Sequence, residues 1–439
     1  MPTQEVARAA RLSTLLRRGA PRPHRLLLDG GAADGWALGG ALYTDAPHAT
    51  LAVFASGWAR WQSAAGVRWH WGDPFALWQT FVDQARAAPG TAAGGVLTAL
   101  AYDLKHAVER LPRRLPWPDT PLLFSAAYDW SYRAGADGAV VRAADARGLA
   151  AAVAFVETAD EPPEPRRAAV VAHPQLARAD YLAMVARAQA YIAAGDIYQV
   201  NLAQPFHAGL VPADAPGLYA AWVEGYPMPC AAYVDGGDWV AVSNSPECLL
   251  TVDGDAVTTR PIKGTRATAA AGELAGDAKE RAEHVMIVDL ERSDLGRVCA
   301  TGSVAVAQFG AIRQYPGLAH MESDVRGRLR PGIDLAALLR ATFPGGSITG
   351  APKIRAMQII EELEPAPRGF YTGAIGWTEP DGRSRFNIAI RTAVLDRAGL
   401  TYWAGGGIVA DSQAGREYEE TLLKSETLFR ALRADHGSA

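Results

Sequence analysis

Hydrophobic and polar positions follow two different periods along the chain, and these predict both helices and strands. Apolar residues at helical spacing run from Arg178 to Ala194 and stop at Gly195, a residue suited to a helix C-cap. The same spacing predicts long helices over 273–295 and 412–432. Alternating or short apolar runs predict strands at 197–202, 239–242, 256–259, 374–377, 386–394 and 400–404. Because the strands come in groups, without strict alternation with helices, we expect an α+β fold with large antiparallel sheets.

One shift in composition divides the chain. Residues 160–167 read Asp-Glu-Pro-Pro-Glu-Pro-Arg-Arg, a polar and proline-rich stretch that is typical of a connection. We therefore predict an N-terminal α/β region, residues 1–165, packed on a longer C-terminal region, residues 166–439.

Composition excludes several classes of protein. The chain has 439 residues, 49% of them hydrophobic, and a net charge of −4, so it offers no electrostatic case for nucleic acid or anionic membrane. Its three cysteines, Cys230, Cys248 and Cys299, are widely spaced and odd in number, which argues against a disulfide framework and against zinc. The N-terminus is polar, with no apolar segment of a secretory signal after it, and no run approaches the roughly 20 apolar residues of a membrane span. We expect a cytoplasmic protein.

Three residues have side chains that could take part in catalysis. Lys263 lies in Pro-Ile-Lys-Gly-Thr, where the proline and glycine predict a turn; a solvated charge is the ordinary interpretation of a lysine there. Glu247 follows Ser245-Pro246, and could donate a proton if burial raised its pKa. His320 lies in Leu-Ala-His-Met-Glu-Ser, and a satisfied core histidine is its alternative.

Two acidic pairs indicate a cation site. Glu280 and Glu283 lie at i and i+3 on a predicted helix, and so do Glu417 and Glu420 on another. Such pairs are commonly solvated when they stand alone. Where two pairs converge they would repel unless a cation lay between them, and ligands that are all oxygen suit Mg²⁺.

Other segments are suited to binding an anion. Gly405-Gly406-Gly407 follows a predicted strand, so its backbone N–H groups could approach an anion, although a tight turn fits equally well. Residues 347–353 place a proline near the start of a probable helix, another site suited to an anion. Arg391 lies in the predicted strand 386–394, where an inward-facing arginine would need an anionic partner and a surface arginine would not.

Together these segments resemble the family of chorismate-utilising enzymes. Residues 280–290, Glu-Arg-Ala-Glu-His-Val-Met-Ile-Val-Asp-Leu, are similar to the family's first metal-binding helix, and residues 416–421, Arg-Glu-Tyr-Glu-Glu-Thr, to its second. Gly94-Gly95-Val96 and Tyr102-Asp103 extend the resemblance into the N-terminal region. The resemblance implies two large sheets facing each other in a sandwich, with helices outside.

The resemblance also implies roles for particular residues. Glu283 and Glu420 would bind Mg²⁺ directly, and Glu280 and Glu417 would bind it through water. Glu247, Lys263 and His320 match catalytic positions of the family. Positions that hold the carboxylates and ring of chorismate are matched by Thr349, Tyr371, Arg391, Gly405, Gly406 and Lys424.

Lys263 distinguishes between the branches of this family. Anthranilate synthases carry alanine at this position, and isochorismate and salicylate synthases carry a water-activating lysine where this chain has Gln199. The resemblance therefore implies the branch that replaces the 4-hydroxyl of chorismate with an amino group. No cysteine lies in a nucleophile-elbow-like setting, so we expect ammonia from a separate glutamine amidotransferase subunit or from solution. An anthranilate synthase and a catalytically silent chorismate-binding protein are the alternatives.

Overall fold

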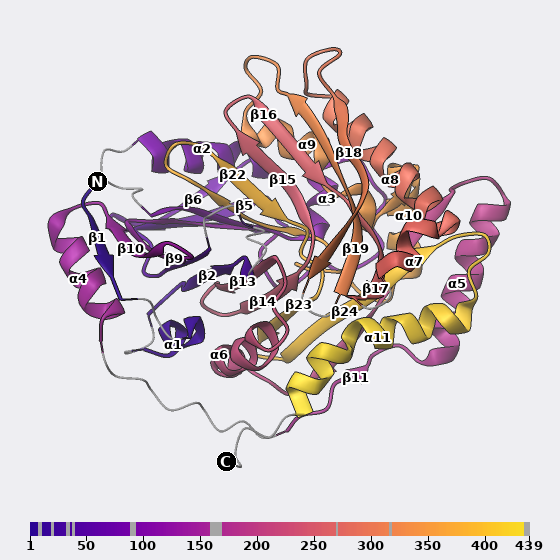
Figure 1. Ribbon diagram of the computed structural model, residues 1–439, viewed down its shortest axis with the longest axis horizontal. Coiled ribbons are helices and arrows are strands. Elements are labelled where there is room, and N and C mark those ends of the chain that lie inside the picture. Colours follow the sequence, from indigo (N-terminus) through magenta and orange to yellow (C-terminus); the bar gives the residue numbers. More distant parts are fainter. Residues whose placement is uncertain are drawn as a thin grey trace.

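The computed structural model describes residues 1–7, 11–18, 22–31, 36, 40–87, 94–158, 169–268, 271–315 and 318–433. Figure 1 shows two large sheets with helices around them. The predicted connection at 160–167 lies outside the described residues, and so does the predicted boundary at 165. Within the described part, none of the helices combines the length and apolar character needed to cross a membrane.

Among the described residues, twelve antiparallel strands form the first sheet. Its order is β1-β10-β9-β3-β2-β13-β14-β23-β24-β12-β11, with β20 paired to β12. The bounds are β1 Thr3–Val6, β10 Gly138–Ala143, β9 Trp130–Gly135, β3 Ala41–Thr44, β2 Leu26–Asp29, β13 Cys230–Asp235, β14 Val240–Ser245, β23 Thr392–Asp396, β24 Gly399–Ile408, β12 Gln199–Ala208, β11 His173–Pro174 and β20 Gly350–Ala351.

The second sheet also contains twelve antiparallel strands within the described ranges. Its order is β17-β19-β16-β15-β22-β21-β7-β8-β4-β5-β6, with β18 paired to β19. The bounds are β17 Ile262–Ala267, β19 Leu318–Arg328, β16 Ala256–Arg260, β15 Cys248–Asp253, β22 Ser384–Asn387, β21 Ala374–Thr378, β7 Gly95–Leu100, β8 Leu123–Tyr128, β4 Ala49–Val53, β5 Trp58–Ser63, β6 Gly66–Trp71 and β18 Ala305–Tyr315.

Helices cover the outer faces of the two sheets. The α-helices are α1 Leu12–Arg17, α2 Pro74–Ala87, α3 Lys105–Val108, α4 Ala146–Val156, α5 Arg178–Ala193, α6 Ala215–Leu218, α7 Ala271–Gly276, α8 Ala278–Gly296, α9 Leu335–Thr342, α10 Lys353–Leu363 and α11 Ala414–Arg433. Short 3₁₀ turns are η2 Tyr102–Leu104, η3 Pro212–Asp214 and η6 Gly346–Ile348, and a π-helical turn, η4, spans Tyr219–Glu224.

The hydrophobic core lies in three layers, as expected when each sheet buries both faces. One cluster lies between the sheets and includes Leu28 of β2 and Ile375 of β21. A second packs α4 and α11 against the first sheet, and a third packs α2 and α9 on the side of the second sheet and α10 against β12 of the first. The α+β prediction and the sandwich of two large antiparallel sheets are confirmed.

Strands from both ends of the chain share both sheets. In the first sheet, Leu28 of β2 pairs with Ala232 of β13; in the second, Thr98 of β7 pairs with Gly376 of β21. The N-terminal strands β2 and β7 are therefore interior members of the two sheets, and they form part of the framework that carries the later segments.

Four sequence predictions of local structure are wrong. Lys263 lies in strand β17, and the predicted turn is a bulge beside it. The helix predicted over 273–295 is two helices, α7 and α8, separated at Asp277, whose carboxylate accepts the N–H of Glu280 at 3.1 Å. The strand predicted over 386–394 is interrupted between β22 and β23, so Arg391 lies outside both strands with a φ of 48°. The glycines at 405–407, predicted to follow a strand, lie within β24.

Candidate active site

Lys263 is placed by a bulge between β17 and β19. Its backbone pairs with Met321, whereas Thr265 already pairs with His320, so Gly264 is the extra residue. Gly264 has a φ of +63°, and a Cβ there would lie 2.7 Å from Leu274 Cδ2 and 3.3 Å from Glu280 Oε2. Only glycine therefore fits this position without displacing its neighbours, and it brings Lys263 next to α8.

The environment of Lys263 favours the neutral amine. Burial lowers the pKa of its ammonium, and the charge of Lys424 lowers it further. The carboxylates of Glu283, Glu247 and Glu280 act in the opposite direction but do not cancel the shift. A neutral lysine has the lone pair that a nucleophile needs.

Glu247 stands at the turn from β14 to β15. Its backbone carbonyl accepts the N–H of Ile388 at 3.0 Å, and the hydroxyl of Ser245 accepts the Glu247 N–H at 3.2 Å. The side chain is 4% exposed, and burial raises the pKa of its carboxyl to about 7, against smaller opposing effects of Ser347, Lys263 and the Ile262 N–H. At neutral pH a large fraction of this group holds a proton that it can donate.

His320 is buried on β19 beside the same bulge. Its Nδ1 lies 3.4 Å from the carbonyl oxygen of Gly264. Burial, together with the nearby charge of Arg391, lowers the pKa of the imidazole to about 4. His320 is therefore neutral at physiological pH and can exchange hydrogen bonds without carrying charge.

Arg391 is a partly buried cation. Burial lowers the pKa of its guanidinium, and its recorded side-chain hydrogen bond within the described ranges goes to Met228 Sδ at 3.5 Å, not to a carboxylate. A partly buried cation of this kind is stabilised by an anion, which suits a ligand that carries carboxylates.

Thr349 and Tyr371 lie in the two segments on either side of α10. Thr349 is fully buried, and its hydroxyl donates to the carbonyl of Gly345 at 3.0 Å. Tyr371 is stacked on Trp403 of β24, with ring centroids 6.0 Å apart and an angle of 10° between the planes. The stacking partner, Trp403, was not predicted from the sequence.

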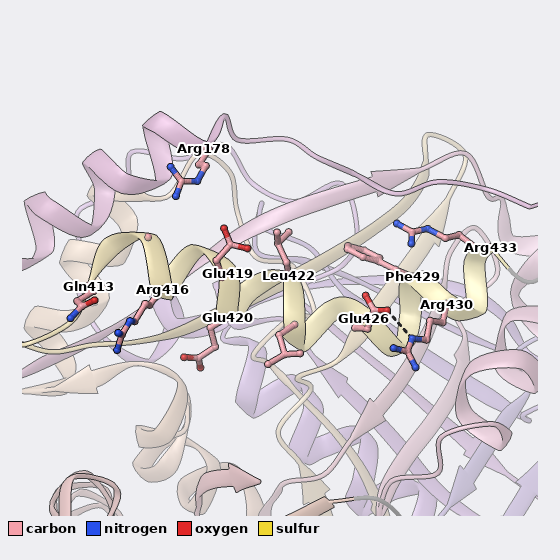
Figure 2. A pocket seen from close by; sticks show the side chains of 12 residues that line it. Arg178, Gln413, Arg416, Glu419, Glu420, Leu422, Glu426, Phe429, Arg430 and Arg433 are labelled. Carbon is pink, nitrogen blue, oxygen red and sulfur yellow. Dashed lines mark hydrogen bonds and ion pairs between the residues drawn. The ribbon is translucent and has the colours of Figure 1, made fainter. Parts of the chain in front are cut away.

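Lys424 links α11 to the part of β24 that contains Gly405, Gly406 and Gly407, called the glycine strand below. Its ammonium donates to the carbonyl of Gly405 at 2.9 Å and pairs with Glu420 at 2.6 Å. A Cβ on Gly406 would lie 3.3 Å from Glu417 Oε2 and 3.5 Å from Glu420 Oε1, so both carboxylates of this helix reach the glycine strand. Figure 2 shows Glu420 leaving α11 in a different direction from Glu419, and both side chains line a groove along the helix.

The acidic residues supply the right donors for a hard cation. Glu280 and Glu283 on α8 act on the charge of Lys263, while Glu417 and Glu420 on α11 approach Gly406. Two of these carboxylates form ion pairs with cationic side chains. Glu280 pairs with Arg266 at 3.4 Å, and Glu420 pairs with Lys424. In the ranges that the structure describes, no three acidic, imidazole or thiol groups are close enough to surround a metal ion. The oxygen donor set fits Mg²⁺, and Mg²⁺ remains a prediction.

Several of the predicted site residues are close enough to interact electrostatically. Glu247, Glu280, Glu283 and Lys424 all act electrostatically on Lys263, and Arg391 acts on His320. The amide of Gln199 lies against the glycine strand, because a Cβ on Gly407 would be 2.7 Å from its Nε2. An acid near its working pKa, a lysine with a lowered pKa and a partly buried arginine suit the substitution of a leaving group on an anionic ring.

Comparisons with known proteins agree with this site. The sequence profile of the chorismate binding enzyme family matches residues 41–430. Anthranilate synthase component 1 of Pseudomonas putida is 39% identical over 394 residues, covering 82% of this chain and 80% of the relative. Aminodeoxychorismate synthase component 1 of Bacillus subtilis is 44% identical over 258 residues, covering 56% of this chain and 54% of that one.

A solved structure has the same fold. The crystal structure of anthranilate synthase component I from Streptococcus pneumoniae superposes with a TM-score of 0.75 at 28% identity, covering 94% of this chain and 93% of the other. The chain belongs to the chorismate binding enzyme family. It is a chorismate-utilising enzyme of the type formed by anthranilate and aminodeoxychorismate synthases.

Proposed function

We propose that this protein is an aminodeoxychorismate synthase component I, which converts chorismate and ammonia to 4-amino-4-deoxychorismate for 4-aminobenzoate and folate synthesis. The observation that carries the proposal is Lys263: a lysine with a lowered pKa, next to a glutamate whose pKa is raised to about 7. An enzyme that adds water or ammonia directly to the ring has no need of a nucleophilic lysine at this place.

The proposed reaction begins with the loss of the 4-hydroxyl. Glu247 donates its proton to this oxygen, so that water leaves in place of hydroxide. The lone pair of Lys263 Nζ forms a bond to C2 as the C4–O bond breaks, and the double bonds of the ring shift. Ammonia then attacks C4, the C2–N bond breaks, and its electron pair returns to Lys263. The surplus proton of the new amino group returns to Glu247, which restores both residues.

The remaining residues bind and orient the substrate. Arg391 and Lys424 supply positive charge for the two carboxylates of chorismate, and Thr349, Tyr371, Gly405 and Gly406 shape the surface around the ring. His320, neutral at physiological pH, exchanges hydrogen bonds with the substrate. Mg²⁺ supplies positive charge opposite the substrate's carboxylates when bound, and would be held by Glu280, Glu283, Glu417 and Glu420.

Anthranilate synthase is the second candidate. It is favoured by the match to the Pseudomonas putida anthranilate synthase, which covers 82% of this chain. That reaction adds ammonia at C2 and eliminates pyruvate, and would leave Lys263 without a role. Release of pyruvate therefore distinguishes the two.

Ammonia is expected to come from a separate glutamine amidotransferase subunit. The purified chain should consume chorismate with ammonium salts and fail to do so with glutamine, and addition of a cognate glutaminase should restore glutamine use. Rates are best compared at equal free NH₃, because the free amine is a small fraction of ammonium at neutral pH. Glutamine-dependent turnover by the chain alone, with contaminating glutaminase excluded, would contradict a separate donor subunit.

A further inference from the structure

A buried arginine outside the predicted catalytic set lies at the junction of the substrate-binding segments. Arg368 follows α10 and precedes Tyr371 by three residues, and its side chain is 1% exposed. Its guanidinium donates to both carboxylate oxygens of Glu364, at 2.7 and 2.8 Å. It also donates to the Ile348 carbonyl at 3.1 Å, the Thr372 hydroxyl at 3.1 Å and the Asn201 carbonyl at 2.9 Å.

These acceptors belong to the backbone around Thr349 and Tyr371. The Ile348 carbonyl is part of the peptide that leads into Thr349, and the Thr349 carbonyl accepts the N–H of Asn201 at 2.8 Å. Glu364 also accepts the N–H of Ala203 at 2.9 Å, and Ala203 packs with Tyr371 and Trp403. One ion pair therefore ties β12, the η6 turn and the segment carrying Tyr371 to each other.

Residues of the N-terminal region also contact Arg368 and the residue after it. The Arg368 guanidinium lies 4.6 Å from the ring centroid of Tyr102, whose ring also receives the Lys105 ammonium at 4.4 Å. The Tyr102 N–H donates to the Gly369 carbonyl at 2.7 Å, and the Gly369 N–H donates to Asp103 at 2.8 Å. The segment at 102–103 thus fixes the backbone on which Arg368 stands.

We propose that Arg368, paired with Glu364 and packed on Tyr102, is a positioning residue that fixes Thr349 and Tyr371 for chorismate, a role that rests on the proposed substrate site. The side chain is suited to this role because guanidinium offers five N–H donors in one rigid plane. Arg368 directs them at four separate residues. A lysine keeps the charge but has a single donor atom, so it cannot satisfy these acceptors together.

The test compares Arg368→Lys with Arg355→Lys, a matched change at an arginine of α10 whose partner Asp196 is about one-third exposed. In Arg368→Lys, amide hydrogen exchange without substrate should rise about 10-fold across 199–203 and 346–351. With ammonium as donor, the KM for chorismate should rise about 10-fold, with a smaller fall in kcat. Arg355→Lys should change neither quantity.

A second pair of variants covers the case in which Arg368→Lys does not fold, since losing one member of a buried ion pair is costly. Tyr102→Leu removes the ring and keeps the ion pair, and should give the same two changes to a smaller degree. Tyr102→Phe keeps the ring and should restore wild-type values.

Faster exchange with an unchanged KM would show a purely structural role, and unchanged exchange would show that Arg368 does not order these segments. Either result overturns the proposal. A wild-type product other than 4-amino-4-deoxychorismate would overturn the proposed function, whereas the exchange rates and the chorismate KM still decide the role of Arg368.

Discussion

Replacing Lys263 with alanine is expected to lower kcat for amination on the order of 100-fold or more, because the covalent route through C2 is lost. The KM for chorismate should change much less, since Arg391 and Lys424 remain to bind the carboxylates. The measurement is steady-state formation of the 4-amino product at saturating chorismate and ammonium, with thermal melting to confirm folding. Some residual direct attack of ammonia on the ring is compatible with the assignment.

Lys263→Arg is the matched control. Arginine keeps a positive charge among Glu247, Glu280 and Glu283 but stays protonated and cannot attack a ring carbon. If Lys263 is the nucleophile, the arginine variant should be as inactive as the alanine variant. Recovery of wild-type kcat in Lys263→Arg would assign the residue an electrostatic role, and a wild-type rate in Lys263→Ala would remove any essential role.

Removal of Mg²⁺ is the second change with a large expected effect. Chelator should abolish turnover reversibly, and Glu283→Gln or Glu420→Gln should raise the Mg²⁺ concentration needed for half-maximal activity by about 10-fold or more. Each change removes one negative charge from an oxygen donor set while keeping nearly the same shape. Calorimetric titration with Mg²⁺ in the presence of chorismate gives a second readout that does not depend on turnover.

Glu419→Gln is the control for these variants. Glu419 is exposed on the same turn of α11 and leaves the helix in a different direction from Glu420. It should therefore leave the Mg²⁺ requirement unchanged. Full turnover in excess chelator, or equal effects of Glu419→Gln and Glu420→Gln, would contradict a metal held by these helices.

The sequence pattern predicts well those features that local spacing encodes. The helices at α5 and α11 and the strands β12, β14, β16, β21 and β24 all lie where periodicity predicts them. The break between α7 and α8 was missed, although Asp277 followed three residues later by Glu280 is the pattern of a helix N-terminus. This local signal was outweighed by the continuous helical pattern around it.

Features that depend on distant partners could not be predicted in the same way. The proline and glycine around Lys263 indicate a turn, but pairing with Met321, far along the chain, makes the segment a bulged strand. The alternation of apolar and polar residues continues through Arg391 in the sequence. The backbone nevertheless leaves the strand before Arg391, where the Ala389 carbonyl accepts the N–H of Thr372. For Arg368 the only local signal is Glu364 four residues before it, and the acceptors at 201 and 348 are distant in sequence.

The identity of the product tests the central claim most directly. Purified protein should be incubated with chorismate, ammonium and Mg²⁺, and the products identified by mass spectrometry together with an assay for pyruvate. The account predicts 4-amino-4-deoxychorismate in an amount equal to the chorismate consumed, without release of pyruvate. Anthranilate with an equal amount of pyruvate would contradict it.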